Sequence, residues 1–278
     1  RSGSVVVPVM YLLHEKEINF ILENSEAKAV ITSSHHLSKI LRATDGLKEK
    51  PKVICVDSPK VEDLIHNHDV EIIECEKVLS KIDVTKEDMA VILYTSGTTG
   101  QPKGVILTHK NLYSNTSNGL SLRDKDEERG TTLGVLPLAH IYGFGVMNGI
   151  LMQGNSVVIF SEFDAEEVFQ AIEKYKVKSF AGVPAMVYAM VYDPNADKYD
   201  LSSLETVGSG SAALPVSLRK KFIEKFNAEV RDAYGLSEAS PGVATQRNDM
   251  PIKEGSVGPP KPGGKIKIAD ENGDELLV

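Results

Sequence analysis

The chain contains no tryptophan, and its 278 residues include only two cysteines, Cys55 and Cys75. Two thiols on separate apolar segments, without metal-like spacing, exclude a disulfide-rich scaffold. We expect both to be reduced and buried. No apolar run approaches the roughly 18 residues of a membrane-spanning helix, and no signal peptide is recognisable. The sequence therefore predicts a cytoplasmic protein without a transmembrane segment.

Clusters of basic residues are also lacking. The net charge is −8 and no block is rich in lysine or arginine, which argues against nucleic-acid binding. The apolar and charged fractions, 41% and 25%, match a soluble globular protein. The length fits one large or two ordinary domains. His66, His68 and Cys75 could form a metal site, but a solvated loop explains them better, and no motif indicates the oligomeric state.

Short apolar strands alternate with helical patterns along the chain, which is typical of α/β folds with parallel sheets. Strands are expected at 5–9, 29–32, 52–56, 71–73, 89–94, 131–136, 156–160, 179–183, 204–207, 229–232 and 265–269. Helices are expected at 14–24, 61–66, 76–82, 108–117, 164–175, 184–192 and 216–226. The last strand should enter a hairpin turn at Asn272 and Gly273.

The most informative run is residues 94–104, YTSGTTGQPKG, which follows an apolar strand. Glycines allow backbone N–H groups to approach an anion, hydroxyl groups add donors, and a lysine adds a compact positive charge. The run therefore predicts a loop around a polyphosphate, although a flexible surface loop is the alternative. It departs from the common P-loop, because Pro102 and Gly104 replace residues which that motif requires. The predicted phosphate-binding residues are Thr95, Ser96, Gly97, Thr98, Thr99, Gly100 and Lys103.

Three further segments, 137–144, 208–214 and 232–238, each follow a predicted strand. Ligands of open α/β sheets bind beyond the carboxyl ends of strands, so we expect these segments and the phosphate loop on one rim. In the first, His140 has the alternative of a hydrogen-bonded core histidine. In the second, Gly208, Gly210 and Ala213 nearly fit a dinucleotide-binding fingerprint. Pro215 argues against that interpretation, because it predicts that the helix starts after the small residues.

The third segment, 232–238, carries groups suited to a nucleotide. Tyr234 offers an aromatic face, Ser237 a hydroxyl group, and Glu238 a hard carboxylate for Mg²⁺. Residues 235–239 also approach the nucleophile elbow of hydrolases, but Ala239 stands where that motif needs glycine.

Residues 94–109, YTSGTTGQPKGVILTH, resemble the signature loop of the adenylate-forming (AMP-binding) enzymes. That family includes acyl-CoA synthetases, peptide-synthetase adenylation domains and luciferases. The resemblance covers nearly the whole chain and is greatest to medium- or long-chain fatty acid–CoA ligases. It implies ATP-dependent activation of a carboxylic acid to an acyl-adenylate. Transfer to coenzyme A then gives acyl-CoA, AMP and pyrophosphate, with ATP, Mg²⁺ and coenzyme A as the small-molecule partners.

The resemblance also implies residue roles. The absence of a carboxylate from 137–144 favours a plain carboxylic acid over an amino acid. Ala213 stands where the family often has proline, which is a mild departure, and Ser237 stands where it usually has threonine, whose hydroxyl group serine keeps. The resemblance implies catalytic roles for Lys103, His140 and Glu238, of which Glu238 would bind Mg²⁺. The acid pocket falls to His140, Tyr142 and Gly210, and further nucleotide contacts fall to Gly210, Ser211, Ala212, Asp232, Tyr234, Gly235 and Ser237.

The resemblance places the chain inside the large N-terminal domain of such an enzyme. We expect an N-terminally truncated first α/β subdomain at 1–88 and the AMP-binding region at 89–278. No Thr-Gly-Asp ribose motif and no small C-terminal domain with a catalytic lysine can be matched. We therefore expect these 278 residues alone to be inactive or impaired. The alternatives are a non-catalytic nucleotide- or acyl-binding module, an aryl-CoA ligase and, from the Gly208 run, an NAD-dependent oxidoreductase.

Overall fold

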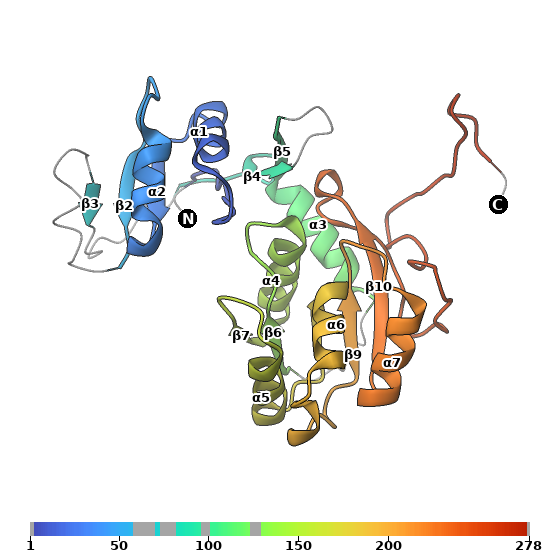
Figure 1. Ribbon diagram of the computed structural model, residues 1–278. Coiled ribbons are helices and arrows are strands. Elements are labelled where there is room, and N and C mark those ends of the chain that lie inside the picture. The colour runs from blue at the N-terminus through green and yellow to red at the C-terminus, as the bar shows by residue number, and fades with distance from the viewer. Residues whose placement is uncertain (1–2, 58–69, 73–81, 96–100, 123–128, 277–278) are drawn as a thin grey trace. The chain divides into compact units, whose positions relative to one another are not determined.

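The computed structural model describes residues 3–57, 70–72, 82–95, 101–122 and 129–276 (Figure 1). The chain divides into two compact units, Arg1–His109 and Lys110–Val278, called the first and second units below. The first unit extends past residue 88, where the sequence placed the end of a first subdomain. That division into domains stays a prediction.

The first unit combines a parallel sheet, an antiparallel hairpin and helices. Strands β1, β2 and β3 pair in parallel in that order, and β4 pairs antiparallel with β5. Ile18 and Leu22 of α1 are one helical turn apart and pack with Leu37 of α2 and Val53 of β2 in a buried core. The elements are α1 (Glu15–Asn24), β1 (Ala29–Thr32), α2 (Ser34–Thr44), β2 (Lys52–Cys55), β3 (Val70–Ile72), β4 (Met89–Thr95) and β5 (Lys103–Thr108).

The second unit is built on a sheet with strand order β11-β10-β9-β8, in which β8, β9 and β10 are parallel and β11 is antiparallel to β10. Strands β6 and β7 form a separate parallel pair, and β6 lies beside β8. The hydroxyl group of Thr132 in β6 donates a hydrogen bond to the backbone carbonyl of Ser179 in β8. The elements are α3 (His109–Leu120), β6 (Thr131–Gly134), α4 (Ile141–Gln153), β7 (Ser156–Ile159), α5 (Ala165–Tyr175), β8 (Ser179–Gly182), α6 (Pro184–Tyr192), β9 (Thr206–Ser209), α7 (Val216–Phe226), β10 (Glu229–Gly235), the 3₁₀ turn η3 (Ser237–Ala239) and β11 (Gly242–Thr245).

Local sequence accounts for the helices that cover this sheet. Asp164 accepts a hydrogen bond from the Glu167 backbone N–H at 2.9 Å and so caps α5. Pro184 occupies the first turn of α6, where its missing N–H is not needed. Phe169 of α5 and Phe222 of α7 are completely buried in one core, and Figure 1 shows α6 and α7 beside β9 and β10. The parallel strands therefore present their carboxyl ends at one edge, where the candidate segments begin.

Several expectations from sequence are confirmed. The fold is mixed α/β with parallel sheets, and Cys55 is a free, buried thiol. Helices form where they were expected at α1, α3, α5, α6 and α7. Cys75, His66 and His68, and nearly all of the helices expected at 61–66 and 76–82, lie outside the described residues.

Other expectations are wrong. Residues 5–9 form no strand, because only Val6 pairs, in an isolated bridge to Val91. Residues 265–269 likewise make only one bridge, between Ala269 and Glu275, although the turn at Gly273 is present. Residues 34–44, 141–153 and 242–245 form α2, α4 and β11, for which no element was expected. Residues 103–108 form β5, for which no strand was expected, and the phosphate loop therefore connects the two strands of an antiparallel hairpin.

Candidate functional site

The predicted phosphate loop joins β4 to β5 in the first unit. Thr95 ends β4 and pairs with Lys103 at the start of β5, so the hairpin holds the two ends of the loop together. Lys103 is exposed. This strand–loop–strand arrangement differs from the strand–loop–helix of a P-loop, in agreement with the departures in the sequence. The remaining predicted loop residues, Ser96, Gly97, Thr98, Thr99 and Gly100, lie outside the described residues.

His140 directly precedes α4 in the second unit. Its Nδ1 accepts a hydrogen bond from the Tyr142 backbone N–H at 3.2 Å, so the imidazole is the N-cap of the helix. A nitrogen that accepts a hydrogen bond carries no proton. Partial burial also lowers the pKa of His140, because it disfavours the charged imidazolium. Both features favour the neutral form of the His140 imidazole.

Tyr142 and Gly210 come together at the edge of the sheet. Gly210 directly follows β9, and a Cβ atom placed on it would lie 3.0 Å from Cε1 of the Tyr142 ring. Burial raises the pKa of Tyr142, so the phenol stays protonated. Two residues expected in one acid pocket, 68 positions apart in the chain, are thus neighbours. Ser211 and Ala212 are both exposed just beyond Gly210.

The dinucleotide interpretation of the Gly208 run disagrees with the fold. In that motif the helix begins at the second glycine, so that its N-terminus meets the pyrophosphate. Here α7 begins only at Val216, with Pro215 as the preceding residue. The small residues from Gly210 to Ala213 therefore form a loop along the sheet edge.

Asp232 is buried within the second unit. Its carboxylate forms an ion pair with the guanidinium of Arg219 on α7, and Gln246 accepts a hydrogen bond from the Asp232 backbone N–H at 2.8 Å. Burial raises the pKa of Asp232 and the Arg219 charge opposes that rise. The second carboxylate oxygen, Oδ1, has no hydrogen-bond partner among the described residues. Asp232 has one strong internal partner, and its predicted contact with adenine stays a prediction.

The segment after Asp232 presents polar groups at the end of β10. Tyr234 is 52% exposed, and the pairing of β10 with β11 shifts register between Tyr234 and Gly235. Ser237 and Glu238 lie on η3, with the Glu238 side chain exposed. The described residues contain no cluster of three or more metal-ligating side chains. A single carboxylate suits Mg²⁺, because this ion is usually held by one or two carboxylates together with substrate phosphates.

Sequence reasoning missed three residues that support these groups. Arg219 pairs with Asp232, Asn115 bonds to the turn that carries Glu238, and Lys261 bonds to Asn115. Asn115 and Lys261 are 146 positions apart, so no local pattern could have linked them. Arg219 is a charged residue on the buried face of an amphipathic helix, and that position was the one available signal.

The whole chain was then compared with known proteins, and residues 1–277 match the AMP-binding enzyme family. The chain belongs to the AMP-binding enzymes. It is 39% identical over 202 residues to a long-chain-fatty-acid–CoA ligase of Bacillus subtilis, covering 72% of this chain and 36% of that protein. It is 32% identical over 279 residues to 4-coumarate–CoA ligase-like 9 of Arabidopsis thaliana, covering 99% and 48%.

Among solved structures, this AMP-binding chain resembles an anthranilate–CoA ligase in complex with anthranoyl-AMP, with a TM-score of 0.84. The identity is 23%, and the match covers 99% of this chain and 52% of the other. At that identity the likeness establishes the fold. The chain spans about a third to a half of the length of the two curated relatives.

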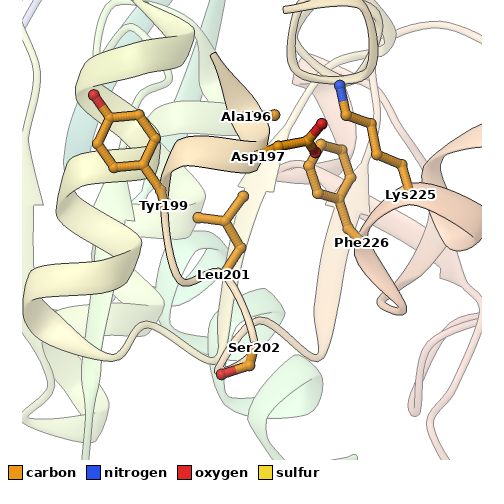
Figure 2. A pocket seen from close by; sticks show the side chains of 7 residues that line it. All are labelled: Ala196, Asp197, Tyr199, Leu201, Ser202, Lys225 and Phe226. Atoms are coloured by element: carbon orange, nitrogen blue, oxygen red, sulfur yellow. The ribbon is translucent and has the colours of Figure 1, made fainter. Parts of the chain in front are cut away.

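A shallow pocket of about 190 Å³ lies elsewhere in the second unit of this AMP-binding chain (Figure 2). Its lining comes from residues before β9 and from the end of α7, which is the amino-terminal side of the parallel strands. Lys225 at its rim donates to the Val191 carbonyl at 2.8 Å and the Asp193 carbonyl at 3.1 Å, so its ammonium group has internal acceptors. We assign this pocket no part in the site. The lining residues are Ala196, Asp197, Tyr199, Leu201, Ser202, Lys225 and Phe226.

The helices that the structure describes include none that is long and apolar enough to cross a membrane.

Proposed function

We propose that the natural protein carrying this chain is an acid–thiol ligase, which uses ATP to join a carboxylic acid to coenzyme A. The observation that carries the proposal is the family match over residues 1–277, together with the YTSGTTGQPKG loop held by the β4–β5 hairpin. Both curated relatives reported above are named as acid–CoA ligases.

The proposed reaction has two steps. A carboxylate oxygen attacks the α-phosphorus of ATP, the bond to the β-phosphate oxygen breaks, and pyrophosphate leaves with that electron pair. The thiol sulfur of coenzyme A then attacks the acyl carbon and AMP leaves, while the thiol proton passes to water. The protein's part in both steps is to position the reactants and stabilise charge.

The residue roles in this proposal are those that the family resemblance implies. Lys103 and the Thr95–Gly100 loop bind phosphate, and Glu238 holds Mg²⁺, which offsets phosphate charge when bound. Tyr234, Gly235 and Ser237 contact the nucleotide at the end of β10 together with Asp232. His140, Tyr142 and Gly210 border the acid pocket, and Ser211 and Ala212 extend the loop along the nucleotide.

The acid is proposed to be a medium- or long-chain fatty acid, with an aromatic acid as the second candidate. The identity to a fatty-acid ligase favours the first, and the identity to a coumarate ligase-like protein favours the second. Pyrophosphate exchange into ATP, driven by decanoate, palmitate, 4-coumarate or benzoate, separates them. Exchange with fatty acids alone is expected, and no exchange with any acid would favour a non-catalytic binding module.

Calorimetric titration of the full-length protein with Mg·ATP tests the nucleotide site. Combined replacement of Lys103 and Glu238 by alanine should abolish binding, because it removes one phosphate-binding cation and the metal carboxylate. The matched control is Lys265→Ala with Glu271→Ala, which removes one exposed charge of each sign elsewhere. Equal binding by both double variants would refute the placement of the site.

A further inference from the structure

The side-chain amide of Asn115 in α3 forms hydrogen bonds to the segment that follows Glu238. Its amide Nδ2 donates to the Ala239 carbonyl at 2.9 Å and the Gly242 carbonyl at 2.8 Å. Its Oδ1 accepts from the Gly242 backbone N–H at 3.3 Å. Ala239 ends η3 and Gly242 begins β11, so one side chain joins both ends of the turn.

Lys261 completes this arrangement from a third segment. Its Nζ lies 3.0 Å from both the backbone carbonyl oxygen and the side-chain Oδ1 of Asn115. A Cβ on Gly242 would lie 2.7 Å from this Nζ, so the lysine side chain lies directly against Gly242. Burial lowers the pKa of Lys261, and within the described part of the chain its ammonium group makes no ion pair. A half-buried charge with only neutral acceptors is costly to keep.

These contacts leave Asn115 one orientation. The amide has two donor hydrogens and one acceptor oxygen, and all of them are used. Rotating the amide by 180° would place NH₂ against the Lys261 ammonium group and the Gly242 N–H, and oxygen against two carbonyls. Lys261 thereby selects the orientation in which Asn115 can hold the turn.

We propose that Asn115, oriented by Lys261, is a positioning residue that fixes the direction of the Glu238 carboxylate and the Ser237 hydroxyl group. Both groups lie on η3, directly before the Ala239–Gly242 turn whose ends Asn115 joins, and the Glu238 side chain is exposed. The inference rests on the proposed function, in which Glu238 holds Mg²⁺. Partners that orient a metal ligand typically matter about 10- to 100-fold for metal affinity or activity.

Asn115→Asp is the sharpest test, because the two side chains have the same shape. The carboxylate keeps its acceptor toward Lys261 and Gly242 N–H and gains an ion pair, but it cannot donate to the Ala239 and Gly242 carbonyls. We expect the Mg²⁺ concentration for half-maximal ATP binding to the full-length protein to rise by about tenfold or more. Ser114→Asp, which adds the same charge at an exposed position of α3, should leave it unchanged.

A double-mutant cycle separates positioning from folding. In a Glu238→Gln background Asn115→Asp should add little, because the group it positions is already lost. A general folding defect would instead add in full. Lys261→Met keeps the chain length without the charge and should raise the Mg²⁺ requirement less than Asn115→Asp does, with Lys265→Met as its exposed control. If Asn115→Asp does not fold, the same cycle is measured with Lys261→Met in its place, and that result tests the inference.

Each remaining outcome is informative. Unchanged Mg²⁺ dependence in a folded Asn115→Asp protein, or equal effects with and without Glu238, would overturn the inference while leaving the proposed function intact. If the unaltered full-length protein binds ATP without any dependence on Mg²⁺, the assignment of Glu238 itself fails, and the inference fails with it.

Discussion

His140 serves as a helix cap through an unprotonated nitrogen, and this gives it a pH signature. The group's pKa is lowered in the folded protein, so the unfolded chain binds its proton more readily. Stability from His140 is therefore fully present above the ordinary histidine pKa. It is lost as pH falls through that value toward the lowered one.

His140→Asn should keep the cap and remove the titration, because asparagine is a good N-cap. We expect the melting temperature of the unaltered protein to fall relative to that of the variant between pH 7.5 and pH 5. Thermal melts monitored by circular dichroism at both pH values measure the difference. Parallel melting profiles for the two proteins would contradict a role for His140 in this pH range.

The contact between Gly210 and Tyr142 makes a second prediction for single residues. Gly210→Ala places a methyl group against the Tyr142 ring and should cost about 1–3 kcal/mol of stability as overpacking. The cost should shrink when Tyr142 is replaced by leucine, since the obstructing ring is then gone. Gly130→Ala, at a position with open space around it, is the control in denaturant titrations. A cost that persists in the Tyr142→Leu background would mean that the ring is not the obstacle.

Helix α4 depends on one of its glycines and not on another. A Cβ on Gly143 would lie 2.3 Å from the Pro137 carbonyl oxygen, while a Cβ on Gly149 would meet nothing within 4 Å. Gly143→Ala should therefore destabilise the protein by at least about 2 kcal/mol. Gly149→Ala should stabilise it by up to about 1 kcal/mol, because alanine is the better helix former. Urea unfolding of the two variants gives the comparison, and similar values for both would be unexpected.

The same helix illustrates what the sequence could not predict. Glycines at 143, 145 and 149 lower the intrinsic helix propensity of residues 141–153. The segment is nevertheless helical, because the packing of the helix in the folded protein outweighs the low propensity. Helices with clear caps, such as α5 and α6, were predicted because the signal is local. The short strand β11 is defined by its pairing with β10, which no local pattern reveals. Residues 265–269 have a strand-like sequence but find only a single partner residue.

Some features of the candidate site could likewise be predicted from the sequence, and others could not. Its positions after strands were predictable, because loops at the carboxyl ends of parallel strands share an edge. The meeting of Tyr142 with Gly210 follows that rule within the second unit. The ion pair of Asp232 with Arg219 and the bonds of Asn115 to Gly242 join residues distant in sequence. Pairings of that kind depend on the register of elements and so required the structure.

At the scale of the whole molecule, each unit has a buried core of its own. The 278 residues contain no match to the Thr-Gly-Asp ribose motif or to the lysine-bearing small domain that the family resemblance implies. The polypeptide also spans only 36% and 48% of its two curated relatives.

A polypeptide of these 278 residues is expected to bind Mg·ATP weakly and to form no acyl-CoA at a steady rate, whereas the full-length protein should do both. The reason is that groups needed to complete adenylation and thioester formation cannot be matched within it. Chromatographic detection of acyl-CoA from ATP, decanoate and coenzyme A compares the two proteins. Sustained turnover by the 278 residues would disprove this expectation.

The half-exposed ring of Tyr234 offers a practical route to kinetics. Because these 278 residues include no tryptophan, Tyr234→Trp would give a polypeptide of these residues a single indole as its fluorescent reporter. The side chain lies at the end of β10, 52% exposed, so the proposed contact with a purine would change its emission. Stopped-flow mixing could then follow nucleotide arrival and departure in real time without an attached dye.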